Sequence, residues 1–295
     1  MRLQHPARCT IDAYFGNDMN QSEVLENRLR RVVSRHNARV KELRRAFHDA
    51  VPNGRGEVAI EGMHLLEEAI RSGLRLATVF CGESATERVQ KLLPQMSSHT
   101  ELLLLPDDTF SSAVPTEKPQ GLAALVKVKS FTFEDALSPG PALVVISAGL
   151  QDPGNLGTMV RSAEAFGATG LLLGERTVSP WNWKALRASA GSMFRVPAVR
   201  VELASALEKV RERGVRVLAT SSRTGDLISR VDLRGPVALL VGNEGSGVPK
   251  DLLAKADEVV AIPQSSRVES LNAGIAASVI LYEAARQRNS SLPRH

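Results

Sequence analysis

The chain has 295 residues, of which 43% are hydrophobic and 23% are charged, which excludes an intrinsically disordered protein. Its length allows one large domain or two domains of ordinary size. Lys and Arg exceed Asp and Glu by 37 to 32, a formal net charge of +5, and this mild excess allows a polyanionic partner without requiring one.

Residues 1–50 are expected to form an N-terminal extension with a basic helix. The first twenty residues lack the apolar core of a signal peptide, and no run of about 18 apolar residues predicts a membrane span. From Gln21 to Ala50 there is no Pro or Gly, and apolar residues recur at helical spacing, which predicts one long helix. Eight basic residues on it make either a solvated face or a phosphate-contacting surface: Arg28, Arg30, Arg31, Arg35, Arg39, Lys41, Arg44 and Arg45.

Residues 51–130 predict a compact α/β domain. After a Gly/Asn turn and a short apolar strand, helices are expected at 62–71 and 85–93, with strands at 76–80, 102–105 and 122–128. The two cysteines, Cys9 and Cys81, lie far apart without metal-ligand spacing. We therefore expect no disulfide or metal site, and a reducing, cytoplasmic compartment.

A Ser/Pro/Gly-rich connection leads to a second domain, residues 140–290. Strands are expected at 142–147, 169–174, 215–220, 237–242 and 258–263, and helices at 156–167, 184–190, 205–213, 250–254 and 270–288. The strands are nearly continuous runs of Val, Leu, Ile and Ala that alternate with helices. This pattern indicates a parallel sheet covered on both faces, so the fold class is α/β.

Three loops at strand ends of this domain collect unusual residues, at 151–161, 241–249 and 262–274. Ligands of open α/β sheets bind at the carboxyl ends of strands, so the three loops are candidates for one site. The glycines of the second loop match neither the dinucleotide fingerprint nor a Walker A motif. Taken alone, Asn155 and Ser270 could simply cap helices, and Arg161 could be an ordinary helix-surface arginine.

Together, the loops strongly resemble the SpoU/TrmH branch of the SPOUT methyltransferases, which transfer a methyl group from S-adenosylmethionine to a ribose 2′-hydroxyl of RNA. The family's N-x-G-x-x-x-R motif corresponds to Asn155, Gly157 and Arg161, and G-N-E-G-x-G to Gly242 through Gly247. The I-P and S-L-N motifs correspond to Ile262 and Pro263, and to Ser270, Leu271 and Asn272. Residues 57–128 more loosely resemble the family's ribosomal-protein-like RNA-binding domain.

The resemblance implies a deep trefoil knot in the second domain, although knots are rare, and a homodimer. It places S-adenosylmethionine beside seven residues: Thr220, Ser221, Gly242, Asn243, Gly247, Ile262 and Leu271. It makes Arg161 the central catalytic residue, with Asn155, Glu244, Ser270 and Asn272 orienting Arg161 and the ribose.

A chemical reason supports an arginine at position 161. The ribose 2′-hydroxyl is a weak nucleophile at neutral pH, so its attack needs positioning and removal of a proton. A neutral arginine base is costly because the ordinary pKa of arginine exceeds about 12. We therefore favour Arg161 as an electrostatic clamp that binds the RNA phosphate.

Two other functions stay open at this point. One is a non-catalytic RNA-binding protein with a methyltransferase shell, and the other is a small-molecule enzyme that uses a nucleotide. A thermal shift with S-adenosylmethionine would support the methyltransferase. A thermal shift with a nicotinamide cofactor would contradict it. The resemblance of residues 57–128 to the family's RNA-binding domain favours ribosomal RNA, and 23S RNA in particular, over transfer RNA as the substrate.

Overall fold

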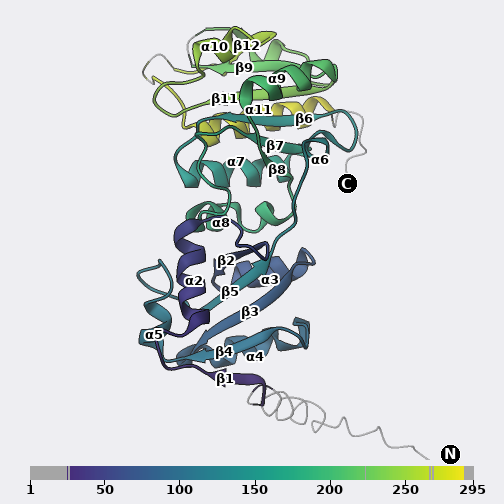
Figure 1. Cartoon of the computed structure of the whole chain (residues 1–295). Helices are drawn as coiled ribbons and strands as arrows, with labels where there is room; N and C mark the ends of the chain where they lie inside the picture. Colours follow the sequence, from purple (N-terminus) through teal and green to yellow (C-terminus); the bar gives the residue numbers. More distant parts are fainter. Residues whose placement is uncertain (1–24, 26, 223, 266, 268, 289–295) are drawn as a thin grey trace, which may run out of the picture.

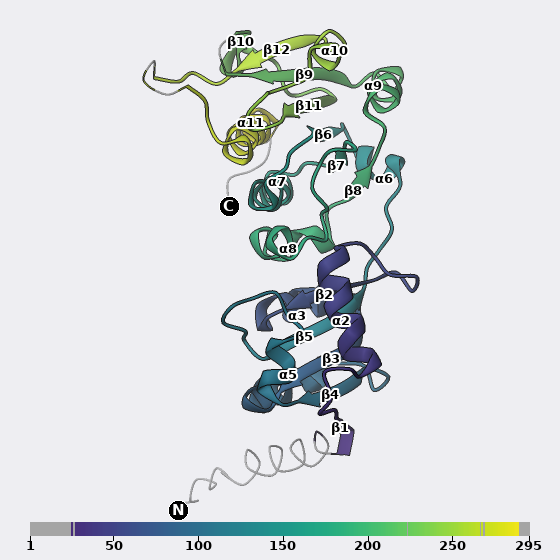
Figure 2. The same cartoon turned by 60° about the vertical axis from the view of Figure 1, so that its left-hand side comes forward.

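The computed structural model describes residues 25, 27–222, 224–265, 267 and 269–288 and contains two sheets stacked along an elongated molecule (Figures 1 and 2). The N-terminal sheet has the order β1-β4-β3-β5-β2. Its strands are β1 (Leu29–Arg31), β2 (Glu57–Glu61), β3 (Arg75–Gly82), β4 (Glu101–Leu105) and β5 (Leu122–Lys127). Its helices are α2 (Ala38–Asp49), α3 (Met63–Arg71), α4 (Thr86–Leu92) and α5 (Asp107–Ser111), with short 3-10 turns η1 (Glu83–Ala85) and η2 (Leu93–Gln95).

The prediction of one uninterrupted helix over 21–50 is wrong: the described residues are helical at 25, 27–28 and 38–49, with strand β1 between them. Strand β1 pairs in parallel with β4, and the Val32 amide donates to the Leu104 carbonyl at 2.9 Å. Helix α2 begins only at Ala38, where the Asn37 side chain accepts from the Arg39 amide. The open edge of β4 and the Asn37 cap therefore outweigh the helical spacing. Residues 21–24 and 26 of that prediction, and Cys9, lie outside the described residues.

Several basic residues of this segment are paired with carboxylates inside the chain. Arg30 and Arg39 both contact Glu101, and Arg31 contacts Glu83. Arg45 pairs with Asp49 one helical turn later. These pairs neutralise part of the charge that suggested a phosphate-contacting surface, so the solvated, ion-paired interpretation describes these four arginines better.

The C-terminal sheet has the order β10-β12-β9-β11-β6-β7-β8, and all its pairings are parallel. Its strands are β6 (Leu143–Ala148), β7 (Gly170–Leu173), β8 (Ala198–Arg200), β9 (Arg216–Ser221), β10 (Asp226–Leu227), β11 (Val237–Gly242) and β12 (Glu258–Ala261). Its helices are α6 (Phe133–Leu137), α7 (Pro153–Ala165), α8 (Trp183–Ser189), α9 (Leu203–Glu212), α10 (Lys250–Leu253) and α11 (Ala273–Arg288), with 3-10 turns η3 (Ser192–Phe194) and η4 (Ile228–Arg230).

Helices cover both faces of this sheet, as the buried strands require. Val145 and Leu239 pack in one cluster with residues of α7 and α11, whereas Val144 and Leu240 pack in another with residues of α6 and α9. The predicted parallel α/β sheet is confirmed. Among the described residues, none of the helices is both long and apolar enough to cross a membrane.

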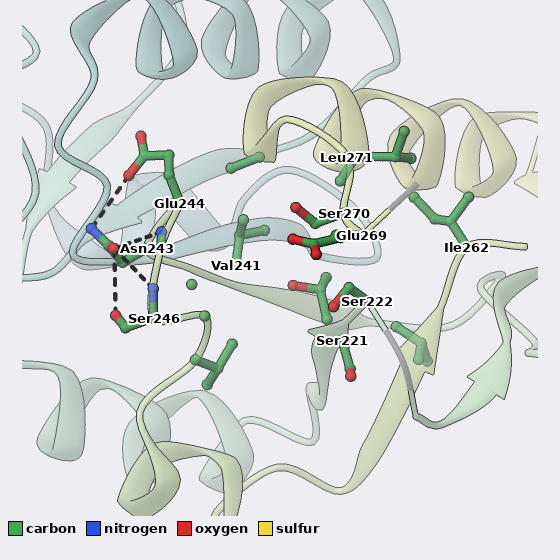
Figure 3. A pocket seen from close by; sticks show the side chains of 18 of the residues that line it. Ser221, Ser222, Val241, Asn243, Glu244, Ser246, Ile262, Glu269, Ser270 and Leu271 are labelled. Atoms are coloured by element: carbon green, nitrogen blue, oxygen red, sulfur yellow. Dashed lines mark hydrogen bonds between the residues drawn. The ribbon is translucent and has the colours of Figure 1, made fainter. Parts of the chain in front are cut away.

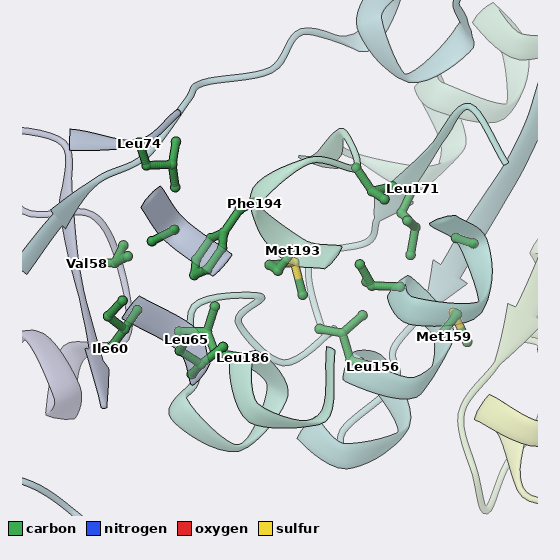
Figure 4. Close-up of a cluster of buried hydrophobic side chains, with 14 of the residues drawn as sticks. Val58, Ile60, Leu65, Leu74, Leu156, Met159, Leu171, Leu186, Met193 and Phe194 are labelled. Atoms are coloured by element: carbon green, nitrogen blue, oxygen red, sulfur yellow. The ribbon is translucent and has the colours of Figure 1, made fainter. Parts of the chain in front are cut away.

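The two sheet units share one apolar cluster. Leu186 of α8 and Met193 and Phe194 of η3 pack with Val58, Ile60, Leu65 and Leu74 of the N-terminal unit (Figure 4). Because one buried cluster includes residues of both units, separating them would expose apolar side chains to water.

Candidate active site

A cavity of about 460 Å³ opens where strands β9, β11 and β12 end (Figure 3). The loops that follow these strands form most of its wall, together with the start of α11. All seven residues predicted to bind the cofactor line it, and so do two of the predicted catalytic residues: Thr220, Ser221, Gly242, Asn243, Gly247, Ile262 and Leu271, with Glu244 and Ser270. Asn155, Arg161 and Asn272 are not part of the wall.

The loop after β11 is held in a tight turn by its own Asn and glycines. The backbones of Asn243 and Gly247 exchange hydrogen bonds at 2.9 and 3.0 Å. The Asn243 side chain accepts from the Gly245 and Ser246 amides and donates to the Gly149 carbonyl at 2.9 Å. A Cβ atom on Gly242 would lie 2.1 Å from the Gly247 carbonyl carbon. Only glycine therefore allows this turn to fold back on the strand end.

Three polar side chains, one from each of the three loops, form one hydrogen-bonded network. The Asn155 side chain donates to Glu244 at 3.0 Å and accepts from Asn272 at 2.6 Å. Glu244 also accepts from the backbone amides of Asp152 and Gln151, at 3.1 and 3.3 Å. These bonds join the start of α7, the β11 loop and the start of α11 behind the cavity.

Hydrogen bonds keep Glu244 ionised. Partial burial opposes its charge, but the bonds from Asn155 and from backbone amides outweigh burial, so the pKa of Glu244 lies below its ordinary value. An ionised carboxylate accepts hydrogen bonds at both oxygens, as this network requires.

Simple capping does not explain Asn155 or Ser270. Asp152 caps α7, because its side chain accepts from the Asn155 amide at 2.8 Å. At the start of α11, Asn272 accepts from the Ile275 amide at 3.1 Å. The Asn155 side chain is thereby free for the network, and Ser270 lies in the cavity wall (Figure 3).

Arg161 lies apart from the residues expected to orient it. It is exposed on α7, and no hydrogen bond or ion pair joins it to another residue within the described part of the chain. One turn earlier, Gly157 packs against α8, where a Cβ atom would lie 2.5 Å from the Ala185 carbonyl oxygen. Gly157 thus serves close helix packing, whereas the Arg161 side chain is exposed to solvent.

The wall of the cavity holds one unused acceptor. Its charged residues are Glu244, which is bound into the network, and Glu269, and the described lining includes no Lys or Arg. The Oε1 atom of Gln264 is buried and has no hydrogen-bond partner among the described residues. A buried acceptor without a partner is costly, so this atom is suited to a donor from a bound molecule.

Gln264 and Glu269 were not predicted as site residues. Both lie in the third loop, between the I-P and S-L-N motifs, where the sequence pattern gives no signal of its own. Their position after the carboxyl end of β12 is the only sequence feature that could have pointed to them.

Comparisons with known proteins match both halves of the chain. The model of the SpoU rRNA Methylase family matches residues 142–282, and that of an MRM3-like substrate binding domain matches residues 37–124. The 23S rRNA (guanosine(2553)-2′-O)-methyltransferase RlmP of Bacillus subtilis (strain 168) is 32% identical over 254 residues, which are 86% of this chain and 98% of that protein.

Solved structures of two bacterial methyltransferases resemble the whole molecule. The SpoU methyltransferase AviRb from Streptomyces viridochromogenes, in complex with AdoMet, gives a TM-score of 0.75 at 28% identity over 86% of this chain and 99% of that one. The AdoMet-bound rRNA methyltransferase from Sinorhizobium meliloti gives 0.75 at 28% identity over 90% of this chain and 100% of that one.

Proposed function

Since the chain belongs to the SpoU rRNA methylase family and is an RNA 2′-O-ribose methyltransferase that uses S-adenosylmethionine, we propose that it methylates 23S ribosomal RNA as a homodimer. The enzyme class replaces the two alternatives that the sequence left open, the non-catalytic RNA-binding protein and the small-molecule enzyme. The proposal concerns the RNA, the assembly and the role of each residue.

The chemistry of the cavity wall supports the placement of the cofactor. S-adenosylmethionine bears a sulfonium and an ammonium cation, and Glu269 is a carboxylate of the wall that the Asn155–Glu244–Asn272 network does not use. Its volume lies within the roughly 300 to 1,000 Å³ typical of small-molecule sites. Gln264 Oε1 would accept from an N–H donor such as the adenine amino group. The seven predicted cofactor residues would hold the remainder by backbone and apolar contact.

The bound cofactor supplies an electrophilic methyl group, and the chain's residues prepare the ribose for attack. The Asn155–Glu244–Asn272 network keeps the loops around the cavity in one arrangement. Ser270, in the wall, would hydrogen bond the ribose. The 2′-oxygen would bond the methyl carbon as its bond to sulfur breaks, and the hydroxyl proton would pass to a phosphate oxygen or to water. Arg161 would clamp the RNA phosphate beside this hydroxyl and stabilise the charge that develops there. A guanidinium can bind two phosphate oxygens at once, which a lysine cannot do.

Helix α11 supplies the surface for the proposed homodimer. Ile275, Val279 and Tyr282 follow each other at helical spacing and are 48%, 38% and 55% exposed. This stripe adjoins α7, because Ser278 hydrogen bonds Ser162 and the Tyr282 ring packs edge-on against Phe166. A second copy on the stripe would cover apolar surface and lie beside the helix that carries Arg161. The trefoil knot and a cytoplasmic location are further proposals that rest on the family.

The RNA proposal rests on the N-terminal unit, which matches a substrate-binding domain, and on the 23S specificity of RlmP. It is tested by incubating the protein with labelled S-adenosylmethionine and separate pools of unmodified ribosomal RNA and transfer RNA. We expect label in the ribosomal pool, with 23S RNA as its main acceptor. Label confined to transfer RNA would overturn the choice of substrate and leave the enzyme class unchanged.

A further inference from the structure

A polar joint links the N-terminal unit directly to helix α7. Arg195, which follows η3, donates to Glu164 of α7 at 2.5 and 3.0 Å. The same guanidinium donates to Glu68 of α3 at 2.8 Å and to Ser72 at 2.9 Å. The Arg195 side chain thus connects α3 of the N-terminal unit with α7, where Glu164 lies about one turn after Arg161.

The joint is closely fitted around a buried carboxylate. The Glu68 side chain is only 7% exposed and pairs with two arginines, Arg195 and Arg71. Gly191 has a φ of +91°, and a Cβ atom there would lie 2.6 Å from Glu68 Cβ. The shared apolar cluster lies beside it, with Met193 and Phe194 between the two units (Figure 4).

The hydrogen bonds of Arg195 also affect the pKa of Glu164. The hydrogen bond from Arg195 holds the pKa of Glu164 below its ordinary value, against the effect of burial. A bidentate arginine fixes both the distance and the orientation of the groups it joins. Arg195 therefore fixes the position of the end of α3 relative to α7. This relative position would affect the reaction if one RNA contacts both units.

We propose that Arg195 is a positioning residue, which sets the place of the RNA held by the N-terminal unit relative to Arg161 and the methyl donor. This inference rests on the proposed function, since it takes the N-terminal unit to hold the RNA. Arg195 does not line the cavity, so it would act through the two units that it joins. Its loss would let the two units shift relative to each other, and a displacement of about 1 Å in a reacting pair can cost roughly 100-fold in rate.

The test compares Arg195→Met with a matched control, Arg216→Met. Arg216 has nearly the same exposure as Arg195, 35% against 34%, and pairs with Glu258 at 2.8 Å, but its hydrogen bonds to Glu258 and Asp232 both lie within the C-terminal unit. We expect Arg195→Met to lower kcat about 100-fold on ribosomal RNA, with KM for RNA and the Kd for S-adenosylmethionine within threefold of wild type. Arg216→Met should retain kcat. Equal kcat values for the two variants would overturn the proposal.

A second readout needs no RNA and no activity. Spin labels at Lys91→Cys on α4 and Lys209→Cys on α9, in a Cys9→Ser background, report the distance between the units, and Cys81 is buried. We expect a narrow distance distribution in wild type and in Arg216→Met, and a broad one in Arg195→Met and in the milder Glu164→Gln. An unchanged distance distribution in both Arg195→Met and Glu164→Gln would contradict the positioning role of Arg195, whichever RNA is the substrate. Methyl label in transfer RNA alone would instead contradict only the choice of ribosomal RNA.

Discussion

Arg161 is the residue on which the chemistry of this enzyme is expected to depend most. The Arg161→Lys variant keeps the charge but loses the two-point contact with a phosphate. We expect kcat to fall roughly 100-fold, the loss typical of a removed transition-state donor, while the Kd for S-adenosylmethionine stays nearly unchanged because Arg161 lies outside the cavity wall.

The matched control for this experiment is Arg187→Lys. Arg187 is also exposed and lies on the neighbouring helix α8, above the Trp183 ring. That variant should retain most of its activity. An Arg161→Lys enzyme as active as the control would remove Arg161 from the centre of the mechanism.

Gln264 makes a different prediction, because its buried oxygen has no partner in the described protein. In Gln264→Leu, the cofactor loses one hydrogen bond, and its Kd should rise about two- to tenfold, the equivalent of a bond worth roughly 0.5–1.5 kcal/mol. The melting temperature of the cofactor-free protein should not fall, since no internal hydrogen bond is lost. Calorimetric titration and thermal unfolding measure the two quantities.

Gln287→Leu provides the opposite result for comparison. Its side chain donates to the Val231 carbonyl at 3.0 Å and accepts from the Leu233 amide at 2.8 Å, away from the cavity. It should lower the melting temperature and leave the Kd alone. If Gln264→Leu behaved in the same way, the amide would serve the fold and not the cofactor.

At the scale of elements, the exposed stripe of α11 predicts the oligomeric state. The double variant Ile275→Glu/Val279→Glu places charge where a second copy would bury apolar side chains. We expect the wild type to elute as a dimer. In the double variant, the dissociation constant of the dimer should rise at least about 30-fold, the effect of losing a single interface hot spot. Light scattering coupled to size exclusion gives the mass directly.

Val51→Glu is the control for this surface. Val51 is 51% exposed, comparable to Ile275, but it lies in the N-terminal unit. It should leave the dimer intact. A wild-type monomer, or a double variant that stays dimeric at every concentration, would place the interface elsewhere or exclude it.

Sequence patterns predict the helices and strands whose type follows from the local order of apolar and polar residues. The buried strands β6, β7, β9 and β11 are continuous apolar runs, so their type was clear from the sequence. Strands β8 and β10 have three and two residues and were missed, since they exist only by pairing with a neighbour. Strand β1 was taken for helix for the same reason, because the edge of β4 that binds it is about 70 residues away in the chain.

In the candidate active site, too, some features follow from the local sequence and others depend on contacts between distant residues. The motifs and the ends of the strands predicted which loops meet, and the cavity contains every residue assigned to the cofactor. The Asn155–Glu244–Asn272 network could not be predicted, because its bonds join residues up to 117 positions apart. The separation of Arg161 from that network likewise depends on how α7 packs against α8 and α11.

At the scale of the molecule, one polypeptide combines two units with distinct tasks in a single elongated body (Figure 1). The C-terminal sheet presents a cavity suited to a cationic methyl donor, and the N-terminal sheet carries the match to a substrate-binding domain. The shared apolar cluster and the Arg195 joint connect them. This arrangement is expected to bring a structured RNA and the cofactor into one fixed geometry.

The measurement that tests this account most directly is the chemical position of the transferred methyl group. Ribosomal RNA labelled by the enzyme from S-adenosylmethionine is digested to nucleosides and analysed by chromatography and mass spectrometry. We expect label in a 2′-O-methyl nucleoside, whose linkage resists alkaline hydrolysis, and almost no label with Arg161→Lys. Label on a base, or equal labelling by the variant, would contradict it.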